Sequence, residues 1–443
     1  MQDSHRLGRN SLLMKYVSAD EAVRLVRSGD TICCQGSTSV PVILQEALAR
    51  RADELRDVQI VSGFNITEGP APFCKPEYKD SFLINSIFVC GDQRAHIAQG
   101  YGSMTPSFLS EVPVLFRSGL LPIDVAFINC SLPDENGYCS YGIGCDISVA
   151  AVETARVVIA QVNEAIPYLY GGCLIHESKI AAAVRCNVPP IAMQFGEPTE
   201  IEKAIGANVA AEIPDGACLQ IGVGGIPNAI LSGIRHHKHL GLHTEAMTDG
   251  VIRLMKEGVI DNSLKKVHPG VSIAALALGS KEMYEYIDHN KTMEFYDVAY
   301  TNDPFLIAQN PKACAINSAL EVDLTGQVCA DSIGETIFSG VGGQHDFMYG
   351  CSLSEGGKCF IALPSRTNKG KAKIVPTLTP GAGVVTTRFQ TQYVATEWGI
   401  AFLRGKNLAQ RAKALIAIAH PDDREELEKA ACKRFGYSFL RLK

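Results

Sequence analysis

The stretch SGDTICCQGSTSVPVIL, Ser28–Leu44, resembles DGACLQIGVGGIPNAIL, Asp215–Leu231, and its Gly36 and Pro41 recur 186 positions later as Gly222 and Pro227. Each stretch opens with a polar residue and a glycine, continues into an apolar run, and then has a glycine followed five residues later by a proline. This pattern predicts a strand, a glycine turn and a helix with proline in its first turn, where the missing N–H is not needed. The same strand–turn–helix unit is therefore expected twice.

A second pair of stretches agrees less closely. FINCSLPDENGYCSYG, Phe127–Gly142, resembles AINSALEVDLTGQVCADS, Ala315–Ser332, because Ile-Asn opens each strand and a glycine and then a cysteine return after a turn. We interpret both pairs as a duplication joined near MQFGEPTEIEKAIGANVA, Met193–Ala210. The prediction is an α/β fold of two similar open domains, residues 1–195 and 196–443. Chance similarity between two ordinary strand–turn–helix units is the alternative.

The composition is that of a well-packed globular protein. Of the 443 residues, 46% are hydrophobic and 20% are charged, and the length predicts two or three domains. The net charge of −6, without a sustained basic run, argues against nucleic acid as a partner. There is no run of 18 apolar residues, so no membrane partner is expected.

The 15 cysteines are scattered along the chain and include no C-x-x-C pair. They show no recurrent zinc-ligand spacing, so no metal is expected. The N-terminal stretch MQDSHRLGRNSLLMKYV lacks the apolar segment of a signal peptide. These features predict a cytoplasmic location, in which most thiols stay reduced and act as small core residues.

The loop QIGVGGIPNA, Gln220–Ala229, has the G-x-G of a dinucleotide-binding turn, and Glu245 lies 21 residues beyond Gly224, about where a ribose-binding acid would stand. Pro227 replaces the third glycine of that pattern, which argues against dinucleotide binding. What remains is a cluster of backbone N–H groups at a helix N-terminus. Such a cluster favours an anion or an oxyanion.

Two later segments also carry candidate binding residues. DSIGETIFSGVGGQHDFMYG, Asp331–Gly350, is too rich in glycine for a strand interior, and its backbone amides could approach a substrate carbonyl, although a plain turn is equally consistent. PSRTNKGKAKIVPTLTPGAGVVTTR, Pro364–Arg388, suits either a phosphorylated ligand tail or a solvated loop. The residues concerned are Gly340, Gly342, Gly343, Gln344, His345 and Asp346 in the first segment, and Arg366, Lys369, Lys371 and Lys373 in the second.

In GLHTEAMTDG, Gly241–Gly250, Glu245 stands where a short apolar strand ends and a helix begins. From these residues alone a helix-capping acid is the simpler interpretation, and Asp249 is the preferred cap. We interpret His243 as a strand histidine that satisfies its own hydrogen bonds, not as a base.

Several long segments together suggest a family. They resemble the acetyl-CoA hydrolase/transferase family over essentially the whole chain, and within it the 4-hydroxybutyrate and butyryl-CoA:acetate CoA-transferases. One departure is Trp398, where members tend to have tyrosine. The matching segments are SGDTI, YGSMTPSFLSEVPVLF, SLPDENGYCSYGIGCD, GVGGIPNAIL, HTEAMTDGV, YTNDPFLIAQ, ADSIGETIFSGVGGQHDF, KIVPTL, VVTTR, VATEWGIAFLRGK and RAKALIAIAHPDDREEL, in this order.

The resemblance implies two similar open α/β domains with the active site in the cleft between them, usually in a homodimer. It implies Glu245 as the nucleophile and Asn302 as a side-chain amide near the reacting carbonyl. Because a carboxylate is a weak nucleophile, we also expect oxyanion donors, and Gly342, Gly343 and the Asn302 amide are the candidates. It implies coenzyme A as co-substrate and no permanently bound cofactor. The coenzyme A contacts carry over to Gly222, Val223, Gly224, Gly225, Ile226, Gly342, Lys373 and, more weakly, Leu320.

The implied activity is the transfer of CoA between an acyl-CoA and a short-chain carboxylic acid, with 4-hydroxybutyrate or butyrate and acetate as the expected acids. A carboxylate suits this exchange because both its anhydride and its thioester can pass the group on. An acyl-CoA hydrolase on the same scaffold is the nearest alternative. A nicotinamide-dependent dehydrogenase would need the missing third glycine, and no basic patch supports a non-catalytic sensor.

Overall fold

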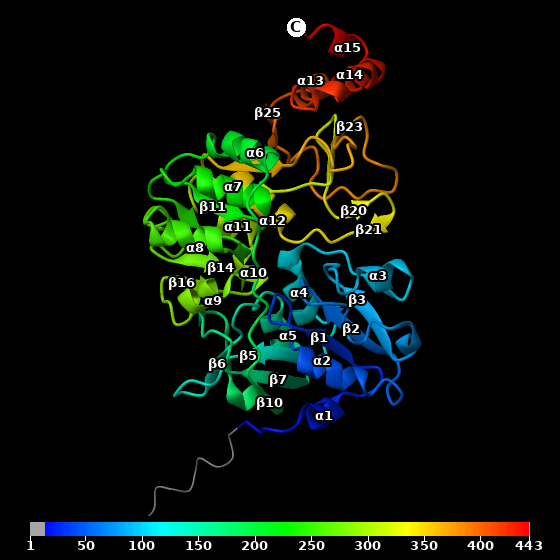
Figure 1. Cartoon of the computed structure of the whole chain (residues 1–443), viewed down its shortest axis with the longest axis vertical. Coiled ribbons are helices and arrows are strands. Elements are labelled where there is room, and N and C mark those ends of the chain that lie inside the picture. Colours follow the sequence, from blue (N-terminus) through cyan, green and yellow to red (C-terminus); the bar gives the residue numbers. More distant parts are fainter. Residues whose placement is uncertain (1–13, 443) are drawn as a thin grey trace, which may run out of the picture. The chain divides into compact units, whose positions relative to one another are not determined.

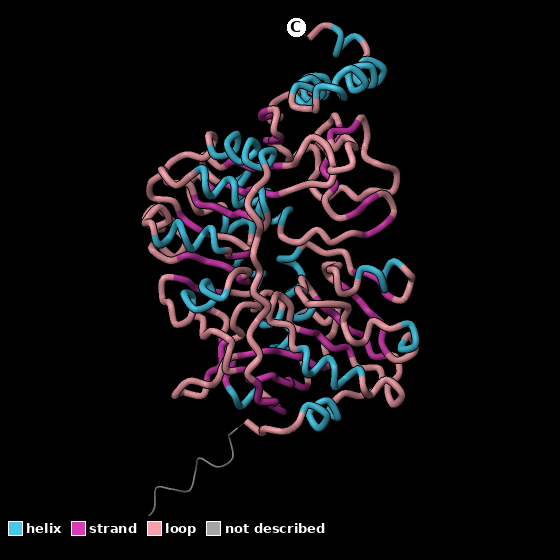
Figure 2. Tube along the Cα trace, in the orientation of Figure 1, coloured by secondary structure: helices cyan, strands magenta, loops and turns pink. Residues whose placement is uncertain are grey.

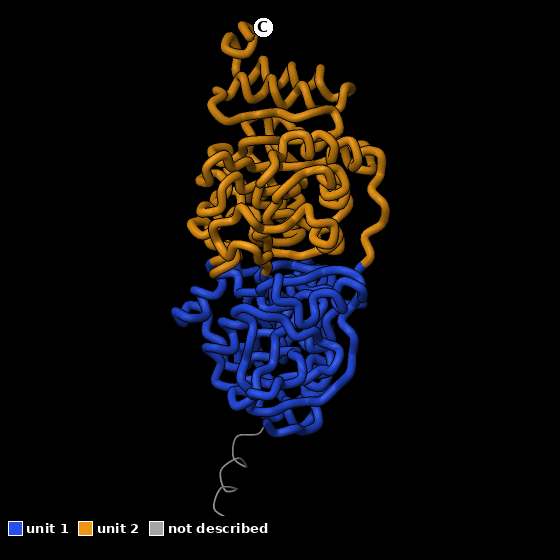
Figure 3. Tube along the Cα trace, turned by 90° about the vertical axis from the view of Figure 1, so that its left-hand side faces the viewer, with its two compact units in different colours: residues 1–107, 111–193, 275–299 blue, residues 108–110, 194–274, 300–443 orange. Residues whose placement is uncertain are grey.

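The computed structural model describes residues 14–442, and the chain forms two compact units (Figures 1 and 3). Unit 1 holds the described residues up to 107, with 111–193 and 275–299, and unit 2 holds 108–110, 194–274 and the described residues from 300. The expected domain bounds, 1–195 and 196–443, stay a prediction, and the units differ from them mainly by the segments 108–110 and 275–299. Most of the N-terminal stretch examined for a signal peptide lies outside the described residues.

Unit 1 is built on a seven-stranded parallel sheet in the order β10-β7-β5-β1-β2-β3-β4. Its central strands are buried on both faces, as expected for a parallel sheet covered by helices. The strands are β1 (Thr31–Cys34), β2 (Val58–Ser62), β3 (Phe82–Ser86), β4 (Gly102–Met104), β5 (Val125–Cys130), β7 (Val157–Asn163) and β10 (Ala182–Cys186), with the short β6 (Tyr138–Ser140), β8 (Tyr170–Gly171), β9 (Leu174–His176), β15 (Leu276–Ala277) and β16 (Met293–Phe295) outside the sheet.

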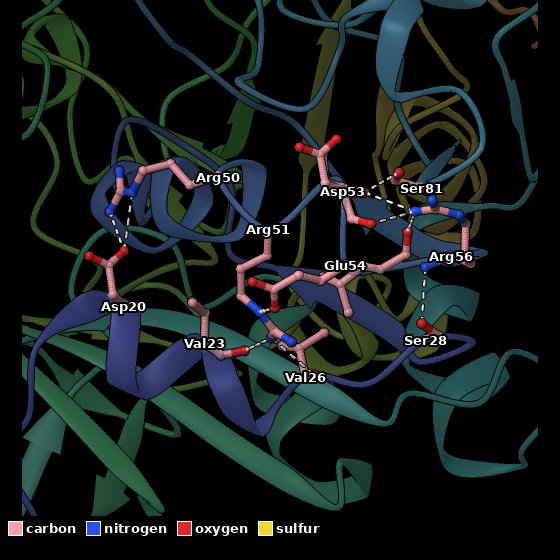
Figure 4. Close-up of polar contacts among 12 residues, drawn as sticks. Asp20, Val23, Val26, Ser28, Arg50, Arg51, Asp53, Glu54, Arg56 and Ser81 are labelled. Atoms are coloured by element: carbon pink, nitrogen blue, oxygen red, sulfur yellow. Dashed lines mark hydrogen bonds and ion pairs between the residues drawn. The ribbon is translucent and has the colours of Figure 1, made fainter.

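The helices of unit 1 are short. Figure 4 shows how three arginines tie α2 and the turn after it to the segment that precedes β1: Arg50 pairs with Asp20 at 2.6 Å, and Arg51 donates to the Val26 carbonyl at 3.1 Å. The Arg56 backbone N–H donates to Ser28 Oγ at 3.0 Å. The α-helices are α1 (Ala19–Ala22), α2 (Val42–Ala49), α3 (Arg94–Ala98), α4 (Val112–Arg117), α5 (Ser148–Thr154) and α9 (Lys281–Ile287), and the 3-10 turns are η1 (Val23–Leu25), η2 (Pro76–Tyr78) and η4 (Glu177–Lys179).

Unit 2 has a six-stranded sheet in the order β12-β11-β17-β22-β24-β25, parallel except for the last strand. Between β22 and β24 the chain runs mostly as loop, which Figure 2 shows. The sheet strands are β11 (Cys218–Ile221), β12 (Gly241–Leu242), β17 (Ala313–Asn317), β22 (Lys358–Ala362), β24 (Tyr393–Thr396) and β25 (Gly399–Phe402), with the short β13 (Ala246–Met247), β14 (Ser272–Ala274), β18 (Glu321–Asp323), β19 (Val328–Cys329), β20 (Ser332–Ile333), β21 (Thr336–Ile337) and β23 (Ile374–Val375).

Some helices of unit 2 pack against strands of this sheet, and others form the C-terminal end of the chain. Gly206 of α6 lies against Ala229 of α7, where an added Cβ would come within 2.6 Å of the alanine Cβ. The helices are α6 (Glu200–Ala210), α7 (Gly225–Gly233), α8 (Asp249–Lys256), α11 (Pro304–Ile307), α12 (Gln344–Leu353), α13 (Leu408–Ala417), α14 (Pro421–Phe435) and α15 (Tyr437–Leu440), and α10 (Val298–Thr301) contains the change from unit 1 to unit 2; the segment 108–110 overlaps the 3-10 turn η3 (Leu109–Glu111).

The strand order supports the predicted duplication. The run β10-β7-β5-β1-β2 of unit 1 has the same order and parallel direction as β24-β22-β17-β11-β12 of unit 2. The strands paired by sequence, β1 with β11 and β5 with β17, hold equivalent places. The α/β class with two open parallel sheets is therefore confirmed. One detail was wrong: Pro227 lies in the first turn of α7, but Pro41 is the N-cap residue of α2 and precedes its first turn.

Three further features of the described part of the chain concern its helices, its thiols and its possible metal ligands. None of its helices is both long and apolar enough to cross a membrane. All 15 cysteines are free thiols, and burial raises the pKa of Cys34 and of Cys173 to about 12. Residues 14–442 contain no group of three or more His, Cys, Asp or Glu side chains placed to hold a metal ion.

Candidate active site

Glu245 lies at the bend between two short strands of unit 2. β12 ends at Leu242, His243 forms an isolated bridge with Ile273, and β13 begins at Ala246, directly after Glu245. The helix that follows, α8, has Thr248 as its N-cap residue, without a side-chain capping bond. Glu245 is therefore not a helix cap. The expectation for Asp249 was also wrong in detail, because Asp249 is the first helical residue of α8.

Asn302 and Gly343 lie against the Glu245 carboxylate. Asn302 directly follows α10 and is fully buried, and its Nδ2 donates to Glu245 Oε2 at 3.0 Å. A Cβ added to Gly343 would come within 1.9 Å of Glu245 Oε2 and 2.4 Å of Asn302 Nδ2. The three residues predicted as catalytic are thus brought together by the fold, although 57 residues separate Glu245 from Asn302.

Gly343 is the N-cap residue of α12, so the carboxylate of Glu245 lies at the N-terminus of a ten-residue helix. The positive end of a helix stabilises a nearby negative charge by about 0.3–1 kcal/mol. Gly342, just before, has φ +58°, a left-handed conformation that favours glycine. The site therefore combines a half-buried carboxylate, an amide donor and a glycine turn at a helix N-terminus.

The side chains after the glycine turn hold the turn in place. Gln344 Nε2 donates to the Ser318 carbonyl at 2.8 Å, and Gln344 Oε1 accepts from Thr386 Oγ1 at 3.0 Å, so this amide is engaged away from Glu245. His345 Nε2 accepts from Gln390 Nε2 at 2.9 Å, and burial lowers the pKa of the His345 imidazole.

A segment that sequence reasoning missed contributes to the same turn. Phe108, Leu109 and Ser110 belong to unit 2, although both flanking stretches belong to unit 1. The Phe108 ring stacks on His345 with centroids 4.0 Å apart, and the Leu109 N–H donates to the Gly342 carbonyl at 3.1 Å. The segment lies inside the matching stretch YGSMTPSFLSEVPVLF, which was its only signal in the sequence.

Ser110 binds Asp346, the third residue of α12. Ser110 Oγ donates to Asp346 Oδ1 at 2.7 Å and its backbone N–H donates to Oδ2 at 3.1 Å. Asn302 Nδ2 makes a longer contact of 3.5 Å with the same Oδ2. The amide nitrogen of Asn302 therefore lies between two carboxylates, those of Glu245 and Asp346.

His243 is buried and acts as a structural hydrogen-bonding group. Its Nε2 lies 2.7 Å from the Thr301 carbonyl, which only accepts, so Nε2 carries the proton, and Nδ1 faces Asn310 Nδ2 at 3.4 Å. Burial, with the nearby positive charge of Lys265, lowers the pKa of His243 to about 3. A neutral imidazole with both nitrogens engaged agrees with the predicted strand histidine.

The residues expected to contact coenzyme A form three groups within unit 2. Gly342 adjoins the Glu245 site, and the loop Gly222–Ile226 runs from the end of β11 into the first two residues of α7. Leu320 and Lys373 directly precede the paired strands β18 and β23, and Val322 N–H donates to the Lys373 carbonyl at 2.8 Å. Burial lowers the pKa of Lys373, against the attraction of Glu397.

Two other sequence candidates are engaged with the C-terminal helices. Arg366 forms ion pairs with Asp422 at 3.1 Å and Asp423 at 2.7 Å, so it ties its loop to the start of α14. Trp398 lies in the turn between β24 and β25, where its ring meets His420 edge-on and Arg424 lies 5.8 Å from its centre.

The fold and the site together indicate the class of protein. It is an α/β protein of two similar units, in which a buried amide binds a carboxylate at a helix N-terminus. The N-terminal domain of the acetyl-CoA hydrolase/transferase family matches residues 1–192, and its C-terminal domain matches residues 279–431. The chain belongs to the acetyl-CoA hydrolase/transferase family.

Known proteins resemble the chain over nearly its whole length. The succinyl-CoA:acetate/propanoyl-CoA:succinate CoA transferase of Fasciola hepatica is 44% identical, covering 94% of this chain and 87% of the relative. The 4-hydroxybutyrate coenzyme A transferase of Clostridium kluyveri is 42% identical, covering 95% and 98%. The crystal structure of RipA from Yersinia pestis has a TM-score of 0.90 at 33% identity, covering 95% of this chain and 98% of that one.

Proposed function

We propose that the chain transfers CoA from an acyl-CoA to a short-chain carboxylic acid by a ping-pong mechanism, with Glu245 as the covalent relay. Its family and relatives make it a CoA-transferase acting between an acyl-CoA and a carboxylate. The single observation that carries the role of Glu245 is its position, held by Asn302 Nδ2 at 3.0 Å against the glycine turn of α12.

The first half-reaction proceeds in two steps. A Glu245 carboxylate oxygen attacks the acyl carbon, the carbon–sulfur bond breaks, and CoA leaves as a thiolate, which gives a mixed acyl-glutamyl anhydride. The thiolate then attacks the glutamyl carbonyl carbon, the anhydride carbon–oxygen bond breaks, and the first acid leaves as a carboxylate. The product is a glutamyl-CoA thioester, and a second acid reverses these steps. No proton transfer is needed, in keeping with a neutral, fully engaged His243.

Asn302 and Gly343 have complementary parts in this scheme. A carboxylate is a weak nucleophile, so the negative oxygen that forms at each attacked carbonyl must be stabilised. Each well-aimed donor lowers such a barrier by about 3 kcal/mol. We assign this task to Asn302 Nδ2 and to the backbone of the Gly342–Gly343 turn. The absence of a Cβ at Gly343 leaves the space that the Glu245 carboxylate and the Asn302 amide occupy.

The finer assignments extend this proposal. We propose 4-hydroxybutyrate or butyrate with acetate as the acid pair. The name of the Clostridium kluyveri relative supports 4-hydroxybutyrate, whereas that of the Fasciola hepatica relative contains acetate but also succinate and propanoate. Coenzyme A binds as co-substrate through Gly222–Ile226, Leu320, Gly342 and Lys373. A homodimer, a cytoplasmic location and an active site in the cleft between the domains stay predictions.

The covalent intermediate can be trapped directly. Incubation with butyryl-CoA followed by borohydride should reduce the thioester, and peptide mass analysis should find the modification at Glu245. The Glu245→Gln variant should lose both the modification and the activity. Glu355→Gln, an exposed acid of the same unit, is the matched control and should keep both. Modification at another residue, or full activity in Glu245→Gln, would refute the assignment.

The same preparation separates a transferase from a hydrolase. In water labelled with oxygen-18, a transferase with acetate as acceptor forms acetyl-CoA and takes no label from water into the released butyrate. A hydrolase releases labelled butyrate and free CoA without any acceptor acid. If butyrate and CoA were released at the full rate without an acceptor acid, the chain would be a hydrolase and our proposal would be wrong.

A further inference from the structure

Three consecutive residues of the segment Phe108–Ser110 each hold one part of the turn that faces Glu245. Phe108 stacks on His345, Leu109 binds the Gly342 carbonyl, and Ser110 binds the Asp346 carboxylate through both its backbone and its hydroxyl. Asp346 is 2% exposed, so its carboxylate is held in a buried position on the first turn of α12. None of these groups is needed for the chemical steps described above.

The orientation of the Asn302 carboxamide is the feature that this arrangement controls. A carboxamide can turn by 180° about its last torsion, which exchanges its NH₂ donor and its oxygen acceptor. With the NH₂ group toward Glu245, the oxygen Oδ1 is buried and has no hydrogen-bond partner. A hydrogen bond to Oδ1 therefore does not explain the observed orientation of the Asn302 carboxamide.

Asp346 does account for it. Its Oδ2 lies 3.5 Å from Asn302 Nδ2, on a second side of the same NH₂ group that binds Glu245. The turned orientation would place Oδ1 against two carboxylates and would remove the Asn302 donor from both. Loss of a hydrogen bond to a charged group such as Glu245 costs about 1.5–3 kcal/mol. Two carboxylates thus favour one orientation, and Ser110 keeps the second carboxylate in place.

We propose that Asp346, fixed by Ser110, is a positioning residue that keeps Nδ2 of Asn302 directed at Glu245. The proposal deepens the function proposed above and rests on it, because it assigns Asn302 Nδ2 as the donor to the reacting carbonyl. It makes Asp346 act through Asn302 and not on the substrate.

The chemistry of substitutions at Asp346 separates geometry from charge. In Asp346→Asn the amide oxygen can take the place of Oδ2 and its NH₂ can donate to Ser110 Oγ, so the contact with Asn302 survives without the charge. Asp346→Ala removes both oxygens. We expect kcat within about threefold of wild type for Asp346→Asn and at least about tenfold lower for Asp346→Ala, a factor that corresponds to about 1.4 kcal/mol. KM for the acyl-CoA should change less than twofold in both.

A double-mutant cycle tests whether Asp346 acts through Asn302. In an Asn302→Ala background there is no amide to orient, so adding Asp346→Ala should lower kcat by less than about twofold. If Asp346→Ala lowered kcat equally in the wild type and in Asn302→Ala, the proposal would be overturned. A change in KM with unchanged kcat would also overturn it. Ser352→Ala removes a hydroxyl at the other end of α12, where it binds the Tyr349 carbonyl, and serves as the matched control with unchanged kcat.

Ser110→Ala keeps the test decisive if Asp346→Ala does not fold. It removes only the 2.7 Å bond to Oδ1 and retains the backbone donor, so we expect a smaller fall in kcat that also disappears in the Asn302→Ala background. An unchanged kcat in Ser110→Ala would contradict the role of Ser110. Borohydride trapping on the wild type separates the two failures: no label at Glu245 refutes the proposed function, whereas a labelled Glu245 with additive losses refutes only the positioning role.

Discussion

Gly343 and Glu245 can be neighbours only because residue 343 has no side chain. A Cβ there would lie 1.9 Å from Glu245 Oε2, far closer than atoms in contact can come. The backbone of Gly343 has φ −91°, which alanine adopts readily, so conformational strain is not the reason for glycine. The reason is the space that the carboxylate occupies.

Gly343→Ala should therefore remove activity while leaving the fold intact. The atoms displaced are the ends of two side chains, Glu245 Oε2 and Asn302 Nδ2, and not backbone, so the chain can fold. The carboxylate must move by more than about 1 Å, and a displacement of that size can cost about 100-fold in rate. Steady-state kinetics and the thermal midpoint check this. Gly91→Ala, where a Cβ would meet nothing within 4 Å, is the matched control. Normal kcat in Gly343→Ala would show that the carboxylate does not act from this position.

Residue-scale predictions came from motifs, their catalytic roles stay predictions, and they missed partners that only folding supplies. Glu245, Asn302 and Gly343 were named from motifs, and the structure brings them together. Ser110 and Asp346, 236 positions apart, could not be paired from the sequence because no local pattern links them. Asp346 was predicted only to belong to a glycine loop.

At the scale of elements, α6 and α7 of unit 2 approach each other closely. Gly206 stands where the helices meet, and an added Cβ would lie 2.6 Å from Ala229 Cβ and 2.9 Å from the Ala229 carbonyl carbon. Because one neighbour is backbone, a rotamer change cannot relieve the clash. The close approach of α7 to α6 therefore depends on this glycine.

Gly206→Ala should destabilise unit 2 even though alanine is the better helix former. The gain in helix propensity is about 1 kcal/mol, whereas overpacking a close contact costs about 1–3 kcal/mol. We expect a lower thermal midpoint by calorimetry. Ala207→Gly, on the exposed face of the same helix, should also lower it, by about 1 kcal/mol of propensity alone. A higher thermal midpoint for Gly206→Ala would contradict this, because it would mean that α6 and α7 can move apart without losing stability.

At the scale of the whole molecule, two buried groups oppose each other in their dependence on pH. Burial raises the pKa of Asp146 in unit 1 to about 6 and lowers that of His243 in unit 2 to about 3. Asp146 binds its proton more tightly in the folded chain, so its contribution to stability is present below about pH 4 and is lost as pH rises through 6. His243 binds its proton more tightly in the unfolded chain, so stability is lost as pH falls from about 6.5 toward 3.

Asp146→Asn should raise stability at pH 7.5 and leave it nearly unchanged at pH 4. Above pH 6 the wild type buries an ionised carboxylate, and a shift of about two pKa units corresponds to about 3 kcal/mol. Thermal midpoints of the two proteins across this range check the prediction. His243 is common to both and cancels in the difference. A constant difference at all pH values would show that Asp146 titrates normally in the folded chain.

The sequence by itself determined the α/β class, the repeated strand–glycine–helix unit and the family. These depend on short-range patterns, because apolar runs, glycine turns and helix starts are set by residues adjacent in the chain. The strand order β10-β7-β5-β1-β2 and its counterpart in unit 2 then supported the weak repeat seen in the sequence.

Only the tertiary structure decided which residues surround Glu245. It also decided that segments 108–110 and 275–299 belong to a different unit from the residues beside them in the chain. The sequence alone favoured a helix cap, and folding placed the carboxylate between Asn302 and Gly343 instead. The contacts of Ser110 with Asp346 join residues far apart in the chain. Such contacts arise from the packing of whole elements, which no pattern of neighbouring residues encodes.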